Sequence, residues 1–157
     1  MGSRSDWGAM EHCVRTLEQL GVPHDVRILS AHRTPEALTT YMAEMEAAGA
    51  EVFIGAAGMA AHLAGVMAAQ TAKPVLGIPM ESKLQGIDSL LSMVQMPAGI
   101  PVATFAVGKA GAVNAALFSA AILANDHPEI GEALIDFRRE QSEKVLRDPD
   151  PRQPAPI

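Results

Sequence analysis

Three side chains that could handle an anion and a proton lie close together in the stretch "SAHRTP": Ser30, His32 and Arg33. Arginine carries a fixed charge and a planar fork of donors that suits a phosphate or a carboxylate. Histidine is the one side chain that gains and loses a proton near neutral pH, so His32 is a candidate general acid and base. A hydrogen-bonded structural histidine beside a surface arginine explains the local pattern equally well.

A second polar stretch, "GSRSDW", contains two hydroxyls, Ser3 and Ser5, and a carboxylate, Asp6, at the start of a predicted helix. The free N–H groups of a helix amino terminus bind phosphate well. The alternative is that Ser5 or Asp6 only caps the helix.

A third stretch, "AAGMAAHLAG", adds His62. A lone histidine beside an apolar residue is more often packed in the core than catalytic. The small residues 56–61 either let backbone amides approach a ligand or serve tight packing. The sequence contains no histidine pair at metal-ligand spacing, no Gly-rich phosphate loop and no G-x-S-x-G turn. We therefore expect no metal at the site.

The elements that must position these side chains alternate between strand and helix. Short apolar runs predict strands at 26–29, 51–58, 73–79 and 102–107, and helical spacing predicts helices at 6–20, 34–49, 61–71, 87–94, 111–125 and 130–146. This alternation indicates a parallel sheet covered on both faces, with ligands beyond the carboxyl ends of its strands. "SAHRTP" and "AAGMAAH" both follow predicted strands, whereas "MGSRSDW" has no predicted strand before it.

The bulk composition limits the class of protein. The chain has 157 residues, 48% of them apolar, which is enough for one domain with a real core. We expect a single α/β catalytic domain over 1–147, whose last helix spans 128–147, and a proline-rich extended tail over 148–157.

The net charge of −6 argues against nucleic acid or an anionic membrane as a partner. Cys13 is the single cysteine, so no internal disulfide forms. We find no signal peptide and no apolar run long enough to span a membrane. A cytoplasmic location is the expectation that fits these features.

Taken together, "GSRSDW", "SAHRTP", "AAHLAG", "GIPMESKLQGIDSLLSMVQMPAGIPVAT" and "GKAGAVNAALFSAAILA" resemble the catalytic subunit family of phosphoribosylaminoimidazole carboxylase. The resemblance is stronger to its bacterial mutase form, which acts on N5-carboxyaminoimidazole ribonucleotide, and it covers nearly the whole chain. It implies a three-layer, doubly wound, flavodoxin-like α/β fold. It also implies a homo-octamer whose C-terminal helix reaches onto a neighbouring subunit, and no metal, ATP or organic cofactor.

The resemblance also implies a reaction in purine synthesis. The carboxylate on N5 of the substrate moves to C4 of the ring by decarboxylation and recapture of the carbon dioxide. His32 matches the proton shuttle of the family. Ser3, Asp6 and Arg33 match its nucleotide-binding positions, with Ser5 and Ser30 nearby, and His62 shapes the pocket.

Three departures from the family pattern carry expectations of their own. The family has an inner strand before "MGS", so we expect this sheet to lack its first strand and the chain to be truncated at its amino end. Met59 stands where glycine is usual, which predicts crowding or an unfavourable backbone angle. Ala64 replaces a proline, with less effect expected. Two alternative functions stay open: a carboxylase that uses free carbon dioxide, which usually has lysine in place of Arg33, and an inactive nucleotide-binding relative.

Overall fold

Helices and strands alternate over residues 35–123, as the sequence predicts, whereas two helices follow one another directly at each end of the chain. The computed structural model describes residues 1–147, 150 and 152. The elements, in chain order, are η1 (Arg4–Asp6), α1 (Trp7–Gln19), α2 (Pro35–Ala47), β1 (Phe53–Ala57), α3 (Leu63–Ala68), β2 (Val75–Pro79), α4 (Ile87–Val94), β3 (Ala103–Thr104), α5 (Lys109–Leu123) and α6 (Pro128–Arg147). Apart from Asp150 and Arg152, the expected proline-rich tail lies outside the described residues.

Helix ends follow local backbone chemistry. Pro35 occupies the first turn of α2, where its missing N–H costs no hydrogen bond. Gly21 and Gly49 follow α1 and α2 with φ angles of +68° and +95°. A residue in this left-handed region ends a helix, and glycine adopts it without a steric penalty.

The sheet consists of three parallel strands in the order β1-β2-β3. β1 pairs with β2 from Phe53↔Val75 to Ala57↔Pro79. β3 pairs with β2 over only two residues, so the strand predicted at 102–107 is shorter than expected. The chain still follows β2 beyond β3, since the N–H of Phe105 donates to the carbonyl oxygen of Gly77 at 3.0 Å.

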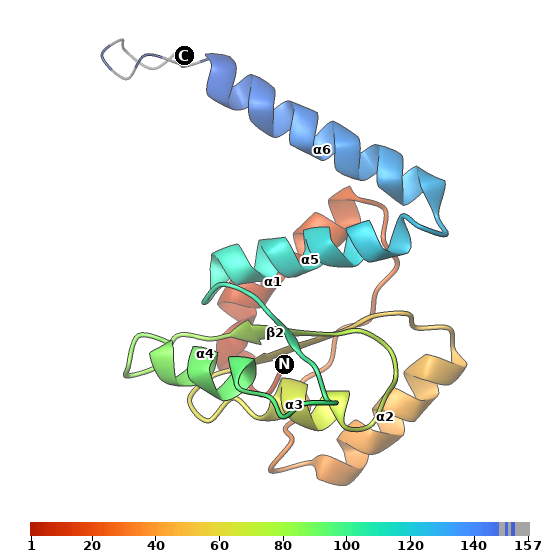
Figure 1. The fold of residues 1–157 in the computed structure, drawn as a ribbon, viewed down its shortest axis with the longest axis vertical. Coiled ribbons are helices and arrows are strands. Elements are labelled where there is room, and N and C mark those ends of the chain that lie inside the picture. Colours follow the sequence, from red (N-terminus) through yellow and green to blue (C-terminus); the bar gives the residue numbers. More distant parts are fainter. Residues whose placement is uncertain (148–149, 151, 153–157) are drawn as a thin grey trace.

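Helices cover both faces of the sheet (Figure 1). Leu76 and Ile78 of β2 point into a core shared with α1, α5 and the start of α6. Phe53 and Val75 point into the opposite core, which is shared with α2, α3 and α4. The three-layer arrangement predicted from the alternation of elements is therefore confirmed.

The segment 26–29, predicted as a strand, is not one in the structure. In the described part of the chain, its backbone hydrogen bonds to a neighbouring segment involve Met1 alone: the amino group of Met1 donates to the carbonyl oxygen of Arg27 at 3.0 Å, and the N–H of Leu29 donates to the carbonyl oxygen of Met1 at 2.9 Å. A strand needs a ladder of such bonds, and one residue does not supply it.

The last helix, α6, packs on α5 through its first turns and then extends away from the body of the protein (Figure 1). Ile130 and Leu134 are buried, whereas Ile135, Val145 and Leu146 are 65%, 70% and 72% exposed. Within the described residues, neither α6 nor any other helix combines the length and apolar character that crossing a membrane requires.

Candidate functional site

Three loops that are far apart in the sequence meet beside the carboxyl end of β1. They are the amino-terminal turn (residues 2–6), the turn before α2 (residues 30–34) and the loop after β1 (residues 58–62). The N–H of Gly2 donates to the carbonyl oxygen of Ala56 in β1 at 3.1 Å, which holds the amino-terminal turn against the sheet. All seven side chains singled out from the sequence lie on these loops.

His32 and His62 form a direct pair. Nε2 of His32 lies 2.9 Å from Nδ1 of His62, with the two rings at 88° and their centres 5.0 Å apart. One of these nitrogens carries the hydrogen and the other accepts it. Both side chains are exposed, and within residues 1–147 the other ring nitrogen of His32, Nδ1, has no hydrogen-bond partner. His32 is thus held at one nitrogen and open at the other.

Arg33 connects the turn before α2 to the amino-terminal turn. Its Nη2 donates to the carbonyl oxygen of Gly2 at 2.9 Å, and its Nε donates to Oγ of Ser30 at 3.4 Å. In the described part of the chain no carboxylate pairs with the Arg33 guanidinium. The side chain is therefore oriented by neutral acceptors while its positive charge stays available to an anion.

Ser30 organises the turn that carries His32 and Arg33. Its Oγ accepts the backbone N–H groups of His32 and Arg33 at 3.4 and 3.2 Å. Oγ1 of Thr34 accepts the N–H of Ser30 at 2.9 Å. Serine and threonine hydroxyls stabilise turns in this way, so the local sequence "SAHRT" builds its own geometry.

The amino-terminal turn forms a capping box, in which the side chains of Ser3 and Asp6 each accept a backbone N–H group. The N–H of Ser3 donates to Oδ2 of Asp6 at 3.1 Å, and Oγ of Ser3 accepts the N–H of Ser5 at 3.3 Å. Ser3 is therefore the capping residue and Asp6 closes the box, whereas Ser5, considered from the sequence, does not cap. Partial burial raises the pKa of Asp6, and the hydrogen bond from Ser3 is the largest of the opposing effects.

Met59 adopts the unfavourable backbone angle expected from the sequence. Its φ is +56°, and its side chain is 68% exposed. The loop around it is held by Ser92, whose Oγ donates to the carbonyl oxygen of Ala60 at 2.5 Å. The left-handed conformation costs a non-glycine residue about 1–2 kcal/mol.

Met59→Gly is expected to raise the free energy of unfolding by about 0.5–1 kcal/mol, because relief of this strain outweighs the added entropy of the unfolded chain. Urea unfolding measures the change. Ala60→Gly is the matched control, since Ala60 is not among the residues with positive φ and gains only the entropic penalty. Equal losses of stability in both variants would contradict the assignment of strain to Met59.

Two glycines at the starts of α4 and α5 lie where the chain is closely packed. A Cβ added to Gly111 would lie 1.7 Å from the carbonyl oxygen of Ala106, and one added to Gly86 would lie 2.5 Å from Cγ1 of Val107. Glycine is required at both positions by this proximity.

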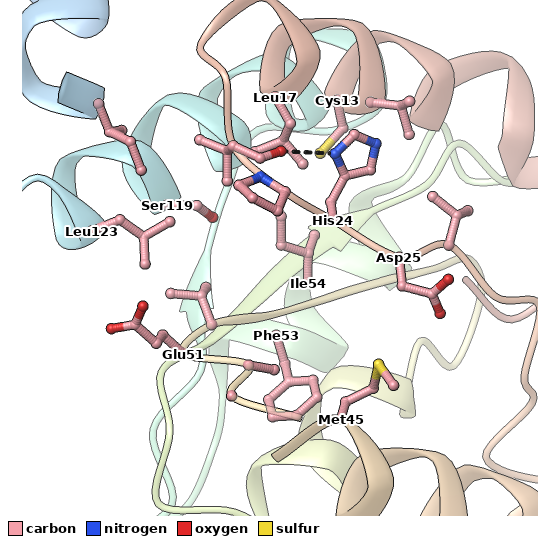
Figure 2. A pocket seen from close by; sticks show the side chains of 18 of the residues that line it. Cys13, Leu17, His24, Asp25, Met45, Glu51, Phe53, Ile54, Ser119 and Leu123 are labelled. Atoms are coloured by element: carbon pink, nitrogen blue, oxygen red, sulfur yellow. Dashed lines mark hydrogen bonds between the residues drawn. The ribbon is translucent and has the colours of Figure 1, made fainter. Parts of the chain in front are cut away.

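A cavity of about 450 Å³ lies apart from these loops, and none of the seven side chains lines it. Figure 2 shows side chains of α1 and α5, among them Cys13, Leu17 and Leu123, facing this space from one side and Met45 of α2 facing it from the other. No chemical motif in the sequence pointed to it.

Comparisons of the sequence and of the structure with known proteins point to the same family. The model of the AIR carboxylase family matches residues 1–144. An N5-carboxyaminoimidazole ribonucleotide mutase of Pseudomonas aeruginosa is 58% identical over 97% of this chain and 94% of its own, and one of Escherichia coli is 52% identical over 99% and 92%. The crystal structure of Treponema denticola PurE, 29% identical, superposes with a TM-score of 0.85 over 94% of this chain and 92% of that one.

Proposed function

Because the chain belongs to the AIR carboxylase family, we propose that it is an N5-carboxyaminoimidazole ribonucleotide mutase acting in purine synthesis. Two observations support the activity. Relatives with that name are more than half identical over nearly the whole chain. Among residues 1–147, no carboxylate pairs with the guanidinium of Arg33, which directly follows His32 of the His32–His62 pair. The flavodoxin-like α/β architecture agrees with the superposed PurE structure.

We assign the proton transfers to His32. In its protonated form, His32 donates to N5 of the substrate as the bond between N5 and the carboxylate breaks, which releases carbon dioxide and leaves a neutral imidazole. Ring C4 then bonds to the carbon dioxide. His32 removes the proton from C4 and returns to its starting form, so one group that both gives and takes a proton completes the cycle.

We assign His62 to positioning His32. A hydrogen bond at one ring nitrogen of a histidine fixes the tautomer and the direction of the other nitrogen. With His32 bonded through Nε2 at 2.9 Å, Nδ1 is the nitrogen directed to the substrate. This assignment gives His62 no direct contact with the reacting atoms.

We assign Arg33 to the phosphate of the nucleotide and Asp6 to its ribose hydroxyls or ring amine. Arg33 supplies a donor fork that is already oriented by Gly2 and Ser30. Ser3 and Ser5 add hydroxyls that are joined to each other at 2.9 Å on the same turn. Ser30 contributes mainly through the turn that its hydroxyl holds. The proposed chemistry needs no metal and no organic cofactor.

We further propose that the protein is a cytoplasmic homo-oligomer, with an octamer as the expected form, and that α6 packs on a neighbouring subunit. The exposed apolar side chains Ile135, Val145 and Leu146 on this projecting helix support the role. The expectation of no nucleic acid and no membrane as partner rests on the net charge of −6.

The test of the function is to offer the purified protein each of two substrates. We expect turnover of N5-carboxyaminoimidazole ribonucleotide without ATP or bicarbonate. Turnover only of aminoimidazole ribonucleotide with bicarbonate would instead identify the carboxylase that uses free carbon dioxide, the alternative that Arg33 in place of lysine argues against. Nucleotide binding without turnover of either substrate would identify an inactive relative.

A further inference from the structure

Ser92 bonds to another element instead of within its own helix. Its Oγ donates out of α4 to the carbonyl oxygen of Ala60, in the loop after β1, at 2.5 Å. A hydroxyl inside a helix often donates to the carbonyl oxygen four residues earlier. Thr16, Thr39 and Ser119 make that bond, at 2.7, 3.2 and 2.9 Å. The Ser92 hydroxyl instead ties α4 to a loop of the candidate site.

The acceptor lies in a turn whose backbone is strained. The N–H of Ala61 donates to the carbonyl oxygen of Gly58 at 3.0 Å, which closes a turn of four residues. Two of these residues, Met59 and Ala61, have φ angles of +56° and +29° although neither is glycine. Such angles persist only where the surrounding structure enforces them. The turn therefore depends on the contacts that its neighbours make with it.

The peptide group that Ser92 contacts is the one that sets the angle at Ala61. Because φ is the torsion about the N–Cα bond, rotation of the peptide group between Ala60 and Ala61 changes φ of Ala61. This group is held on both sides, since its carbonyl oxygen accepts from Ser92 and its N–H donates to Gly58. Without the Ser92 hydroxyl, the carbonyl oxygen is free to turn away from α4, and Ala61 can relax to the negative φ that its side chain favours.

The helix α4 is a firm support for this contact. Met93, the residue after Ser92, is buried against the sheet, and a Cβ added to Gly77 of β2 would lie 3.1 Å from its Sδ. Ser92 itself is half-buried at the edge of this packed face. Its hydroxyl therefore acts from a position that the packing of α4 on β2 fixes.

His62 begins where the turn ends. Its carbonyl oxygen accepts the N–H of Val66 at 2.9 Å at the start of α3, but the residue is exposed. Over residues 1–147, 150 and 152, the ring of His62 has one hydrogen-bond partner, His32. The direction of this ring therefore depends on the backbone that carries it, and Ala61 is the residue directly before it.

We propose that Ser92 is a positioning residue for the His32–His62 pair. Its hydroxyl holds the peptide group between Ala60 and Ala61 in the orientation from which His62 reaches Nε2 of His32. The inference rests on the proposed function, because it assigns Ser92 to the geometry of the proton shuttle. The histidine pair can nevertheless be observed without substrate, so the two proposals can fail separately.

The first measurement compares the turnover of Ser92→Ala with that of the starting protein. We expect kcat to fall by about 10- to 100-fold, because displacement of a catalytic group by about 1 Å costs up to about 100-fold. The Kd of the nucleotide product should stay close to its starting value, because Arg33 and Asp6 lie on other loops. Ser92→Thr keeps a hydroxyl at this position and is expected to retain most of the activity.

The second measurement observes the histidine pair directly. In protein labelled with nitrogen-15 histidine, NMR spectra under alkaline conditions report which ring nitrogens carry hydrogen and which accept it. His32→Asn and His62→Asn assign the two rings by the loss of their signals. We expect the ring-nitrogen shifts of the pair to be alike in the starting protein and Ser92→Thr, and to move toward those of free imidazole in Ser92→Ala.

Ser119→Ala is the matched control for the loss of a helix hydroxyl. Oγ of Ser119 donates within its own helix, to the carbonyl oxygen of Ala115. Each alanine variant loses one hydrogen bond, so we expect a small fall in Tm for both. Only Ser92→Ala should change kcat and the histidine spectra, and this difference separates a positioning role from a purely structural one.

Unchanged histidine spectra in Ser92→Ala would overturn the proposal. So would a Ser92→Ala protein with normal kcat, or a loss of kcat in Ser92→Thr equal to the loss in Ser92→Ala. If the starting protein does not turn over the substrate, the proposed function is refuted, and the histidine spectra still decide whether Ser92 holds the pair.

Discussion

His32→Asn is expected to lower kcat by about 10³-fold, within the range that loss of a general acid and base produces. The variant retains a polar side chain of similar size on a turn that Ser30 and Thr34 hold through backbone groups. Nucleotide affinity should therefore stay within a few-fold of the starting value. Steady-state kinetics and calorimetric titration with the nucleotide product measure the two effects separately.

Two further histidine variants test the roles assigned to the pair. His62→Asn leaves the shuttling group in place but removes the bond to Nε2 of His32, so we expect a smaller loss of kcat and a displaced pH profile. His12→Asn, on α1 and outside the site, is the matched control and should change neither. A His32→Asn protein that turns over at near-normal rate would refute the proton-shuttle assignment.

Arg33→Ala is expected to weaken nucleotide binding by about 10- to 100-fold, the cost of one charge-assisted contact to phosphate. The loss also frees the carbonyl oxygen of Gly2, which Arg33 holds at 2.9 Å. Arg33→Lys keeps the charge but lacks the planar fork, so its affinity should be intermediate. Titration with the nucleotide and with its dephosphorylated nucleoside measures the affinity with and without the phosphate contact.

If Arg33 binds the phosphate, its replacement should affect the nucleotide and the nucleoside differently. The nucleoside should bind the starting protein and Arg33→Ala with nearly equal affinity, because it lacks the group that Arg33 contacts. Arg15→Ala removes an exposed arginine that pairs with Glu11 and serves as the control for net charge. If the nucleoside loses as much affinity as the nucleotide, Arg33 acts through the turn rather than through phosphate.

The parts of the fold that local sequence determines were predictable. The apolar runs that become β1 and β2 are each buried on both faces, and their continuous hydrophobic pattern is typical of parallel strands. The helix α4 was predicted with its observed bounds. Segment 26–29 was predicted wrongly, because whether an apolar run becomes a strand depends on which backbone lies beside it.

The candidate site also has one part that local sequence determines and one part that depends on tertiary packing. Ser30, His32 and Arg33 are adjacent in sequence, and the turn that presents them forms from bonds among residues 30–34. The contact between His32 and His62 joins residues 30 positions apart, so only tertiary packing reveals it. The cavity of about 450 Å³ has no chemically distinctive motif among its lining residues, so residue types did not point to it.

The position of Trp7 gives this protein a built-in optical probe. Trp7 is the single tryptophan of the chain, it directly follows Asp6, and 41% of its surface is exposed. When it is excited at the long-wavelength edge of its absorption, where Tyr41 does not absorb, its emission reports on the polarity around the amino-terminal turn. Ligand titrations can be followed in the unlabelled, unmutated protein by the shift and quenching of that one emission band.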